Sequence, residues 1–358
     1  SLAVRAQKNQ VYLLAGTYTS PGASEGIYVY SFDQSTGVST PVSSVPSTNP
    51  SYLAVSPDEK FVYAVNETKN GQVSSFSFDK ASGKLSLLNV QSSNGDDPCY
   101  VSTDKTGKWV AVGNYSSGTL ALYPVQKDGS LGKAVQVIRH EGSGVNTDRQ
   151  EGPHVHSTVF SPDNKYLFVA DLGTDKEMIY SFDSKKGKLK PAKMPFIQTE
   201  PGSGPRHFIF HPQMNRAYLI QELSGTISVY QYAKGTLALL QDISSQPLDY
   251  LGEAAGADIH VSPDGKYLYA SNRATSNTIG IYQVKADGTL QLYDHQSTLG
   301  KTPRNFNFDP SGNFLLAANQ NSNDIVVFKV DKSTGTLTDS GQRIKISKPV
   351  CVKWVGMK

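Results

Sequence analysis

Imidazole, guanidinium and carboxylate side chains gather in a few short segments of this chain. Four of them are Gly152-Pro153-His154-Val155-His156, Gly204-Pro205-Arg206-His207, Ala257-Asp258-Ile259-His260 and Pro303-Arg304. Two more end in a charged residue, Gln221-Glu222 and Asn272-Arg273. Histidine and glutamate can act as general bases, and arginine pairs with carboxylate and phosphate oxygens. If the fold brings these segments together, they form a polar pocket suited to an anion.

A repeat of about 50 residues must position these segments. A glycine followed closely by leucine or valine comes after an apolar segment seven times, at Gly37, Gly83, Gly129, Gly187, Gly235, Gly288 and Gly335. The repeats also contain apolar segments such as 61–65, and segments of alternating polarity such as 279–284. No stretch of helical period competes with this pattern. Seven units of four strands predict an all-β protein, a seven-bladed β-propeller.

The two ends of the chain are predicted to complete one blade. Residues 11–14 match a second strand without a first, and residues 348–354 match a first strand. The C-terminal strand should therefore pair into the N-terminal blade as its innermost strand and close the ring. We expect residues 1–358 to form one propeller domain, with 1–6 either the end of a secretory signal or a vector remnant.

The strand order predicts where the site lies. The first strand of each blade begins, and the second ends, on one face of the ring, so these positions converge on one mouth of the channel. Four asparagines recur at one repeat position and are predicted to be structural: Asn66, Asn114, Asn272 and Asn319. Four other residues break the repeat and are predicted to be catalytic: His156, Glu222, Arg206 and Arg273. Glu67 is expected to be a solvated carboxylate at the rim.

One junction between blades, residues 139–151, is longer than the others and polar. It leads into the segment with His154 and is expected to fold over the channel mouth and deliver Arg149 and Gln150. His154 and His156 stand at i and i+2, so they could hold a metal together with His207, His260 or a carboxylate. The neighbouring arginines favour an anion instead, and we expect no metal.

Composition excludes several classes of function. The formal charge is +3, the sequence pI is about 8.5, and no run of Lys or Arg occurs, which argues against a nucleic-acid partner. No apolar stretch is long enough to cross a membrane. Cys99 and Cys351 are expected on first strands two blades apart, without a disulfide. We expect a monomer in the cytoplasm, or in the periplasm if residues 1–6 end a signal peptide.

Nearly the whole chain resembles the propeller-type lactonase family, which includes bacterial 6-phosphogluconolactonases and fungal carboxymuconate-lactonising cyclases. The resemblance is carried by residues 148–156, Ala170-Asp171-Leu172-Gly173, Gly204-Pro205-Arg206-His207, residues 258–265, Ser271-Asn272-Arg273 and Pro303-Arg304-Asn305-Phe306. It implies catalytic roles for His156, Arg206, Arg273 and Glu222. One departure is Gln221, where the family usually has asparagine.

The resemblance implies hydrolysis of 6-phosphogluconolactone to 6-phosphogluconate, a reaction of the pentose phosphate pathway, without a cofactor. His156 or Glu222 would activate water, and one arginine would stabilise the oxyanion. The other arginines, with His207 or Arg304, would hold the phosphate. The residues expected to contact substrate are His154, His207, Arg149, Arg304, Asp258 and His260. A covalent route is disfavoured because no Gly-x-Ser-x-Gly motif occurs and neither cysteine has a neighbouring histidine in the sequence.

Three alternatives remain at this point. A cycloisomerase that interconverts a carboxymuconate and its lactone would also need arginines and a general acid or base. A lactonase for another sugar lactone would use the same residues. A non-catalytic binding module is the third, because propellers often present only a protein-binding rim and fold does not settle function.

Overall fold

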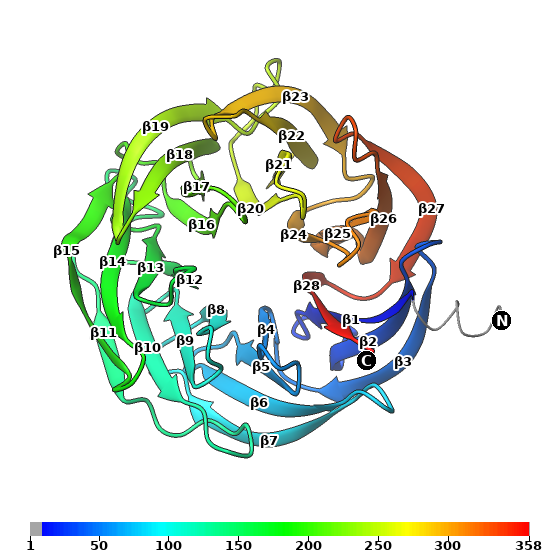
Figure 1. Ribbon diagram of the computed structural model, residues 1–358, viewed down its shortest axis with the longest axis horizontal. Helices are drawn as coiled ribbons and strands as arrows, with labels where there is room; N and C mark the ends of the chain where they lie inside the picture. The colour runs from blue at the N-terminus through cyan, green and yellow to red at the C-terminus, as the bar shows by residue number, and fades with distance from the viewer. Residues whose placement is uncertain (1–8, 358) are drawn as a thin grey trace.

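A computed structural model describes residues 9–357 as 28 strands and one short 3₁₀ helix, arranged in seven four-stranded sheets around a central channel (Figure 1). The N-terminal blade contains, from the centre outward, β28 (Pro349–Gly356), β1 (Gln10–Thr17), β2 (Gly26–Asp33) and β3 (Ser39–Pro46). The next two blades are β4 (Leu53–Val55), β5 (Phe61–Asn66), β6 (Gln72–Asp79) and β7 (Lys84–Ser92), then β8 (Pro98–Thr103), β9 (Trp109–Asn114), β10 (Thr119–Pro124) and β11 (Gln136–Arg139). The prediction of a seven-bladed, all-β propeller is confirmed.

The other four blades follow the same order from the centre outward. They are β12 (Val155–Phe160), β13 (Tyr166–Asp171), β14 (Lys176–Asp183) and β15 (Lys188–Gln198), then β16 (Pro205–Phe210), β17 (Arg216–Gln221), β18 (Thr226–Ala233) and β19 (Thr236–Ser244). The last two are β20 (Gly256–Val261), β21 (Tyr267–Asn272), β22 (Thr278–Val284) and β23 (Leu290–Ser297), then β24 (Pro303–Phe308), β25 (Phe314–Asn319), β26 (Asp324–Val330) and β27 (Leu337–Lys345). The 3₁₀ helix, Gln320–Ser322, joins β25 to β26. Among residues 9–357 no helix is long and apolar enough to span a bilayer.

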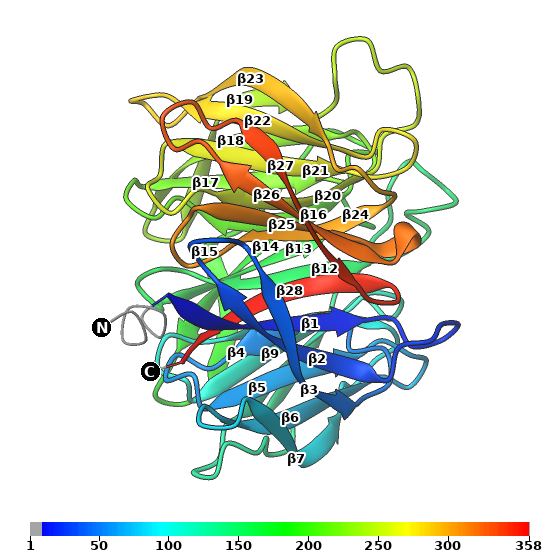
Figure 2. The same ribbon diagram turned by 90° about the vertical axis from the view of Figure 1, so that its right-hand side faces the viewer.

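The C-terminal strand closes the ring as predicted. β28 pairs antiparallel with β1, from Val11 opposite Gly356 to Gly16 opposite Cys351. Figure 2 shows β28 lying alongside β1. Without β28, the inner edge of β1 would have no paired strand. Residues 1–6, for which a signal or vector origin was considered, lie outside the described residues.

The repeated glycines explain the period of the sequence. All seven have positive φ, between 62° and 88°, which an L side chain rarely adopts. Six of them also lie against an aromatic ring of another blade, and Gly288 lies against the side chain of Arg216. A Cβ on Gly187 would come within 1.9 Å of Trp109, and one on Gly235 within 2.2 Å of Tyr166. Each glycine is thus required by its turn and by contact between blades.

Candidate active site

A cavity of about 350 Å³ opens where first strands begin and second strands end. Its lining residues are Glu67, Cys99, Tyr115, Arg149, His156, Glu222, Arg273 and Arg304. Five of these were singled out from the sequence as catalytic or substrate-binding. Arg206, His154, His207, Asp258 and His260 are not among the lining residues. The strand ends therefore converge on one mouth of the channel, as predicted. Some of the charged residues form the cavity wall, and the others lie in a layer behind it.

The four recurrent asparagines are structural, as predicted. Each ends a second strand, and its Nδ2 donates to a backbone carbonyl in the segment before the first strand of the same blade. The acceptors of Asn66, Asn114, Asn272 and Asn319 are Thr48, Ser93, Ser245 and Thr298, at 2.6–3.1 Å. Gln221 stands at this position in its blade and donates instead to Ser228 Oγ at 2.9 Å. These bonds fix the strand ends from which site residues project.

Two repeat positions supply every lining residue of the cavity except Arg149, and they also supply Tyr18 and Arg206. Tyr18, Glu67, Tyr115, Glu222 and Arg273 each directly follow the last residue of a second strand. Cys99, His156, Arg206 and Arg304 each stand where a first strand shifts register against its neighbour. A β-bulge inserts one residue and redirects its side chain. The bulges thus aim four functional side chains, and the strand ends aim five more.

Glu222 is the buried centre of a cluster of three arginines. Its Oε1 lies 2.7 Å from Arg149 Nη2 and 3.3 Å from Arg273 Nη2, and its Oε2 accepts from Arg206 Nε at 3.0 Å. Burial alone would raise the pKa of Glu222, but the charges of Arg273, Arg206 and Arg149 hold it far below the usual range. Both carboxylate oxygens are occupied and the group is ionised, so this cluster carries three positive charges against one negative.

His156 is a neutral imidazole on the cavity wall. Burial, then the charge of Arg206, lowers its pKa well below the ordinary 6.5. Its Nδ1 is buried and has no hydrogen-bond partner among the described residues. Protonation beside the arginines is unfavourable, so His156 is suited to hydrogen bonding in its neutral form and poorly suited to accepting a proton.

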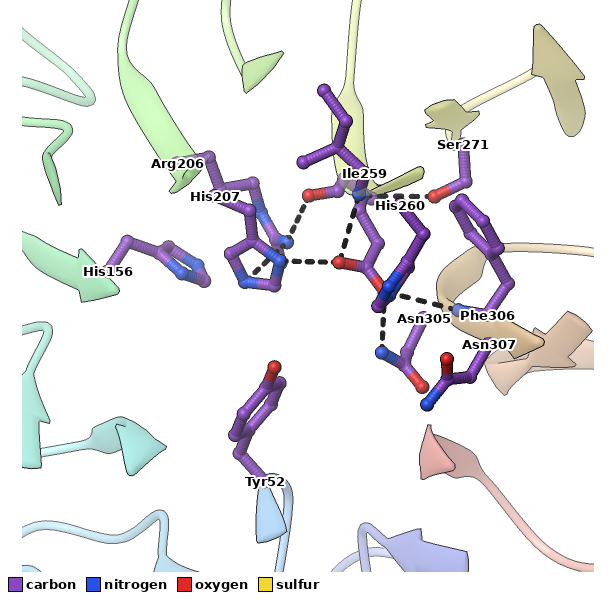
Figure 3. Close-up of polar contacts among 12 residues, drawn as sticks. Tyr52, His156, Arg206, His207, Ile259, His260, Ser271, Asn305, Phe306 and Asn307 are labelled. Atoms are coloured by element: carbon purple, nitrogen blue, oxygen red, sulfur yellow. Dashed lines mark hydrogen bonds and ion pairs between the residues drawn. The ribbon is translucent and has the colours of Figure 1, made fainter. Parts of the chain in front are cut away.

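A hydrogen-bond network behind the cavity holds Arg206 in place (Figure 3). Arg206 Nη1 donates to Ala257 O at 2.6 Å and to His207 Nε2 at 3.3 Å. Since Nε2 of His207 is thereby the acceptor, its Nδ1 carries the proton and donates to Asp258 Oδ1 at 2.8 Å. Burial, then Arg206, lowers the pKa of His207 to about 4, so this ring is neutral as well.

Asp258 anchors the far side of this network. Its Oδ2 lies 2.9 Å from His260 Nε2 and accepts from Asn305 Nδ2 at 2.6 Å. Burial would raise the pKa of Asp258, but His260 and His207 hold it well below its usual range. Figure 3 shows that His207, His260 and Asn305 come from neighbouring innermost strands, with the rings of His156 and His207 on the channel side. His207, Asp258 and His260 thus join blades and orient Arg206.

The second carboxylate of the cavity, Glu67, has a different environment. Its Oε2 accepts from Tyr18 Oη at 2.9 Å and from Ser51 Oγ, and lies 4.0 Å from Arg304 Nη2. Its side chain is only 17% exposed, so the expectation of a solvated rim carboxylate was wrong. The guanidinium of Arg304 lies over the Tyr18 ring, 5.5 Å from its centre, and donates no hydrogen bond to the described residues.

The long loop between β11 and β12 delivers Arg149 to the cavity, as predicted, where Nη2 also donates to Tyr115 Oη at 3.2 Å. Gln150 faces away instead. It is fully buried and donates to Leu172 O and Asp175 Oδ1 at 2.9 and 2.8 Å, which anchors the loop.

His154 does not form the strand pair with His156 that was considered for a metal. It precedes β12, and the register shift after Val155 separates the two positions. Its Nδ1 lies 2.9 Å from Tyr115 O and its Nε2 3.0 Å from Glu151. No group of three or more His, Cys, Asp and Glu side chains within residues 9–357 is arranged to hold a metal ion.

Cys99 was not recognised as a site residue because no histidine is near it in the sequence. The fold brings it to the cavity beside His156, whose carbonyl lies 3.8 Å from Sγ. Burial, then Glu67, raises the pKa of the thiol, so Cys99 is protonated and a weak nucleophile. Both cysteines are free, as expected, and both are buried.

The chain is similar to known proteins over nearly its whole length. Residues 12–354 match the family model described as "Lactonase, 7-bladed beta-propeller". Relatives named 6-phosphogluconolactonase include one from Formosa agariphila, 38% identical over 94% of this chain and 97% of its own, and one from Bacillus subtilis, 37% identical over 95% and 97%.

Solved structures of similar proteins superpose over nearly the full chain. A putative 6-phosphogluconolactonase from Bacteroides fragilis has a TM-score of 0.93 and 42% identity, covering 98% of this chain and 99% of its own. The periplasmic gluconolactonase PpgL of Pseudomonas aeruginosa has a TM-score of 0.93 and 36% identity, covering 98% and 100%. With this match and these relatives, the chain belongs to the seven-bladed β-propeller lactonase family.

Proposed function

We propose that this protein hydrolyses 6-phosphogluconolactone to 6-phosphogluconate with water as the nucleophile. Family membership selects an enzyme over the binding module considered from the sequence. The observation that carries the choice of substrate is the uneven charge of the cavity. Three guanidiniums surround Glu222, which leaves two excess positive charges at that end, whereas Glu67 and Arg304 balance at the other.

The excess charge matches a phosphate monoester, which carries about −1.5 to −2 at pH 7. Arg149 and Arg273 line the cavity, and Arg206 supports them from behind through Glu222. We assign the phosphate to this end, with Arg149 and Arg273 as its direct partners. Glu222 is then the residue that organises the arginines, a different role from the general base considered from the sequence.

The other end of the cavity suits the neutral lactone ring. Arg304 has unused donors, and preorganised donors stabilise an oxyanion without reorganisation in the transition state. The neutral ring of His156 lies on the same wall and can add a second hydrogen bond to the carbonyl oxygen. The thiol of Cys99 is protonated, which favours direct attack by water over a covalent intermediate.

The test compares two substrates and two arginine variants. Turnover of 6-phosphogluconolactone and of gluconolactone is measured above spontaneous hydrolysis, with chelator present. Arg273→Gln should lower kcat/KM by roughly 10- to 100-fold for the phosphorylated substrate alone, the effect of losing one charge-assisted hydrogen bond. Arg304→Gln should lower turnover of both substrates. Arg343→Gln, on the surface pair with Asp339, is the matched control and should change neither.

Gluconolactone is the second candidate substrate, favoured by the similarity to the structure named as a periplasmic gluconolactonase. We place phosphogluconolactone hydrolysis by a monomer in the cytoplasm, where that substrate is made. Equal kcat/KM for both lactones in wild type, and no selective effect of Arg273→Gln, would replace the phosphorylated substrate with the unphosphorylated one. No rate above background for either lactone would refute lactone hydrolysis altogether.

A further inference from the structure

The two carboxylates of the cavity differ in how many of their oxygens are free. Both oxygens of Glu222 are taken by arginines, which leaves it no lone pair directed at a substrate water. The Oε1 of Glu67 accepts no hydrogen bond from any described residue, whereas Oε2 accepts from Tyr18 and Ser51. A general base must reach the proton it abstracts, so the free oxygen of Glu67 meets a requirement that Glu222 does not.

The backbone and side chain of Glu67 are held in a fixed position. Its N–H donates to Asn49 O at 3.1 Å, and its carbonyl accepts from Asn49 Nδ2 at 3.1 Å. Tyr18 Oη, a neutral phenol whose pKa is raised by burial, donates to Oε2. The hydroxyl of Ser51 approaches the same oxygen, so Oε1 remains the oxygen available to a ligand in the cavity.

The position of Glu67 in the ring also fits. Glu67 comes from the blade of β5 and Glu222 from the blade of β17, three blades further along the chain. Arg304, whose guanidinium donors are unused, lies 4.0 Å from Glu67. A base and an oxyanion donor therefore stand together at the electrically balanced end, away from the arginine cluster.

We propose, on the basis of the function proposed above, that Glu67 is the general base of lactone hydrolysis. Its Oε1 takes a proton from water as the water oxygen bonds to the lactone carbonyl carbon. The carbonyl π electrons move onto oxygen, where Arg304 and His156 stabilise the charge. Collapse restores the carbonyl and breaks the bond to the ring oxygen, and the proton on Glu67 passes to that oxygen to give the hydroxy acid.

Glu67→Gln removes the base and keeps the size of the side chain. For wild type and this variant, kcat and KM are measured on both lactones above spontaneous hydrolysis. We expect kcat to fall by roughly 10²- to 10⁴-fold on both substrates, with KM changed by less than about threefold. Asp339→Asn, at the surface and outside the cavity, is the matched carboxylate control and should change neither kcat nor KM.

A structural role for Glu67 is separated from a catalytic one by chemical rescue. In Glu67→Gly, added formate supplies a small carboxylate base and should restore part of kcat, while formate should leave the kcat of wild type unchanged. A raised KM with kcat retained would assign Glu67 to substrate hydroxyls and overturn the proposal, as would a fall in kcat that formate does not reverse. If wild type itself lacks turnover, the proposed function fails and this role with it.

Discussion

Replacing Glu222 with glutamine should destabilise the fold strongly, because one carboxylate neutralises three arginines. Arg206 and Arg273 are 1% and 14% exposed in their side chains, and Glu222 is 8% exposed. Removing one partner of a buried ion pair costs about 3–5 kcal/mol, because the remaining charge is buried without compensation. Arg149 adds little to this cost, since its side chain is 42% exposed and solvent screens its charge.

The free energy of unfolding, from equilibrium urea titration, tests this value. Asp339→Asn is the matched control, because its bidentate pair with Arg343 lies at the surface and should be worth less than about 1 kcal/mol. Combining Glu222→Gln with Arg206→Met should recover part of the loss, as the uncompensated charge is removed too. If Glu222→Gln costs no more than Asp339→Asn, the reasoning that makes Glu222 the counter-ion of the cluster is refuted.

Three further perturbations test the scaffold around the site. In the unfolded chain His156 and His207 take up protons near pH 6.5, whereas the fold lowers both pKa values, that of His207 to about 4. Below pH 6.5 the unfolded state therefore binds more protons than the folded state, so the urea concentration at the unfolding midpoint should fall between pH 7 and pH 4.5. The fall should be smaller in His207→Asn. Asn319→Ala leaves the Thr298 carbonyl without its donor and should cost about 1–3 kcal/mol with kcat unchanged, since neither residue lines the cavity. Ending the chain at Ser347 removes β28 and exposes the edge of β1, so we expect the truncated protein to lose its cooperative thermal transition in circular dichroism; a transition like that of wild type would contradict the closure argument.

The fold was predictable because its contacts are repeated. Each repeated glycine has a left-handed backbone, and each lies against a side chain of another blade, which is an aromatic ring in six of the seven. Both constraints require glycine, so the same residue recurs once in every repeat. The pairing of β28 with β1 was predictable because the N-terminal repeat lacks a first strand and the C-terminal end carries an additional one. Local turn chemistry and strand count were thus sufficient for the architecture.

The site was only partly predictable. Its residues differ from those at the same position in other repeats, but the sequence does not show which of these differences place a side chain in the cavity. Arg206 breaks the repeat and was identified, although it lies behind the cavity wall. Glu67 was interpreted as a solvated rim carboxylate although it follows Asn66 as Arg273 follows Asn272. The repeat position was the available signal, and it would also have pointed to Tyr115. Sequence did not separate the cavity wall from the layer behind it, since Arg206 and Arg304 occupy the same bulge position in their blades and only Arg304 lines the cavity.

The recurrent asparagines explain how one scaffold can hold such different chemistry. Asn66 and Asn272 bond the backbone in the same way, yet the next residues are a glutamate and an arginine. Because the asparagine fixes the strand end, the residue after it is aimed at the channel whatever its type. The bulged residue of the first strand is equally free, as Cys99 and His156 illustrate. A change at these positions alters the charge of the cavity without altering blade packing, so substrate preference among related propellers should follow these residues rather than overall identity.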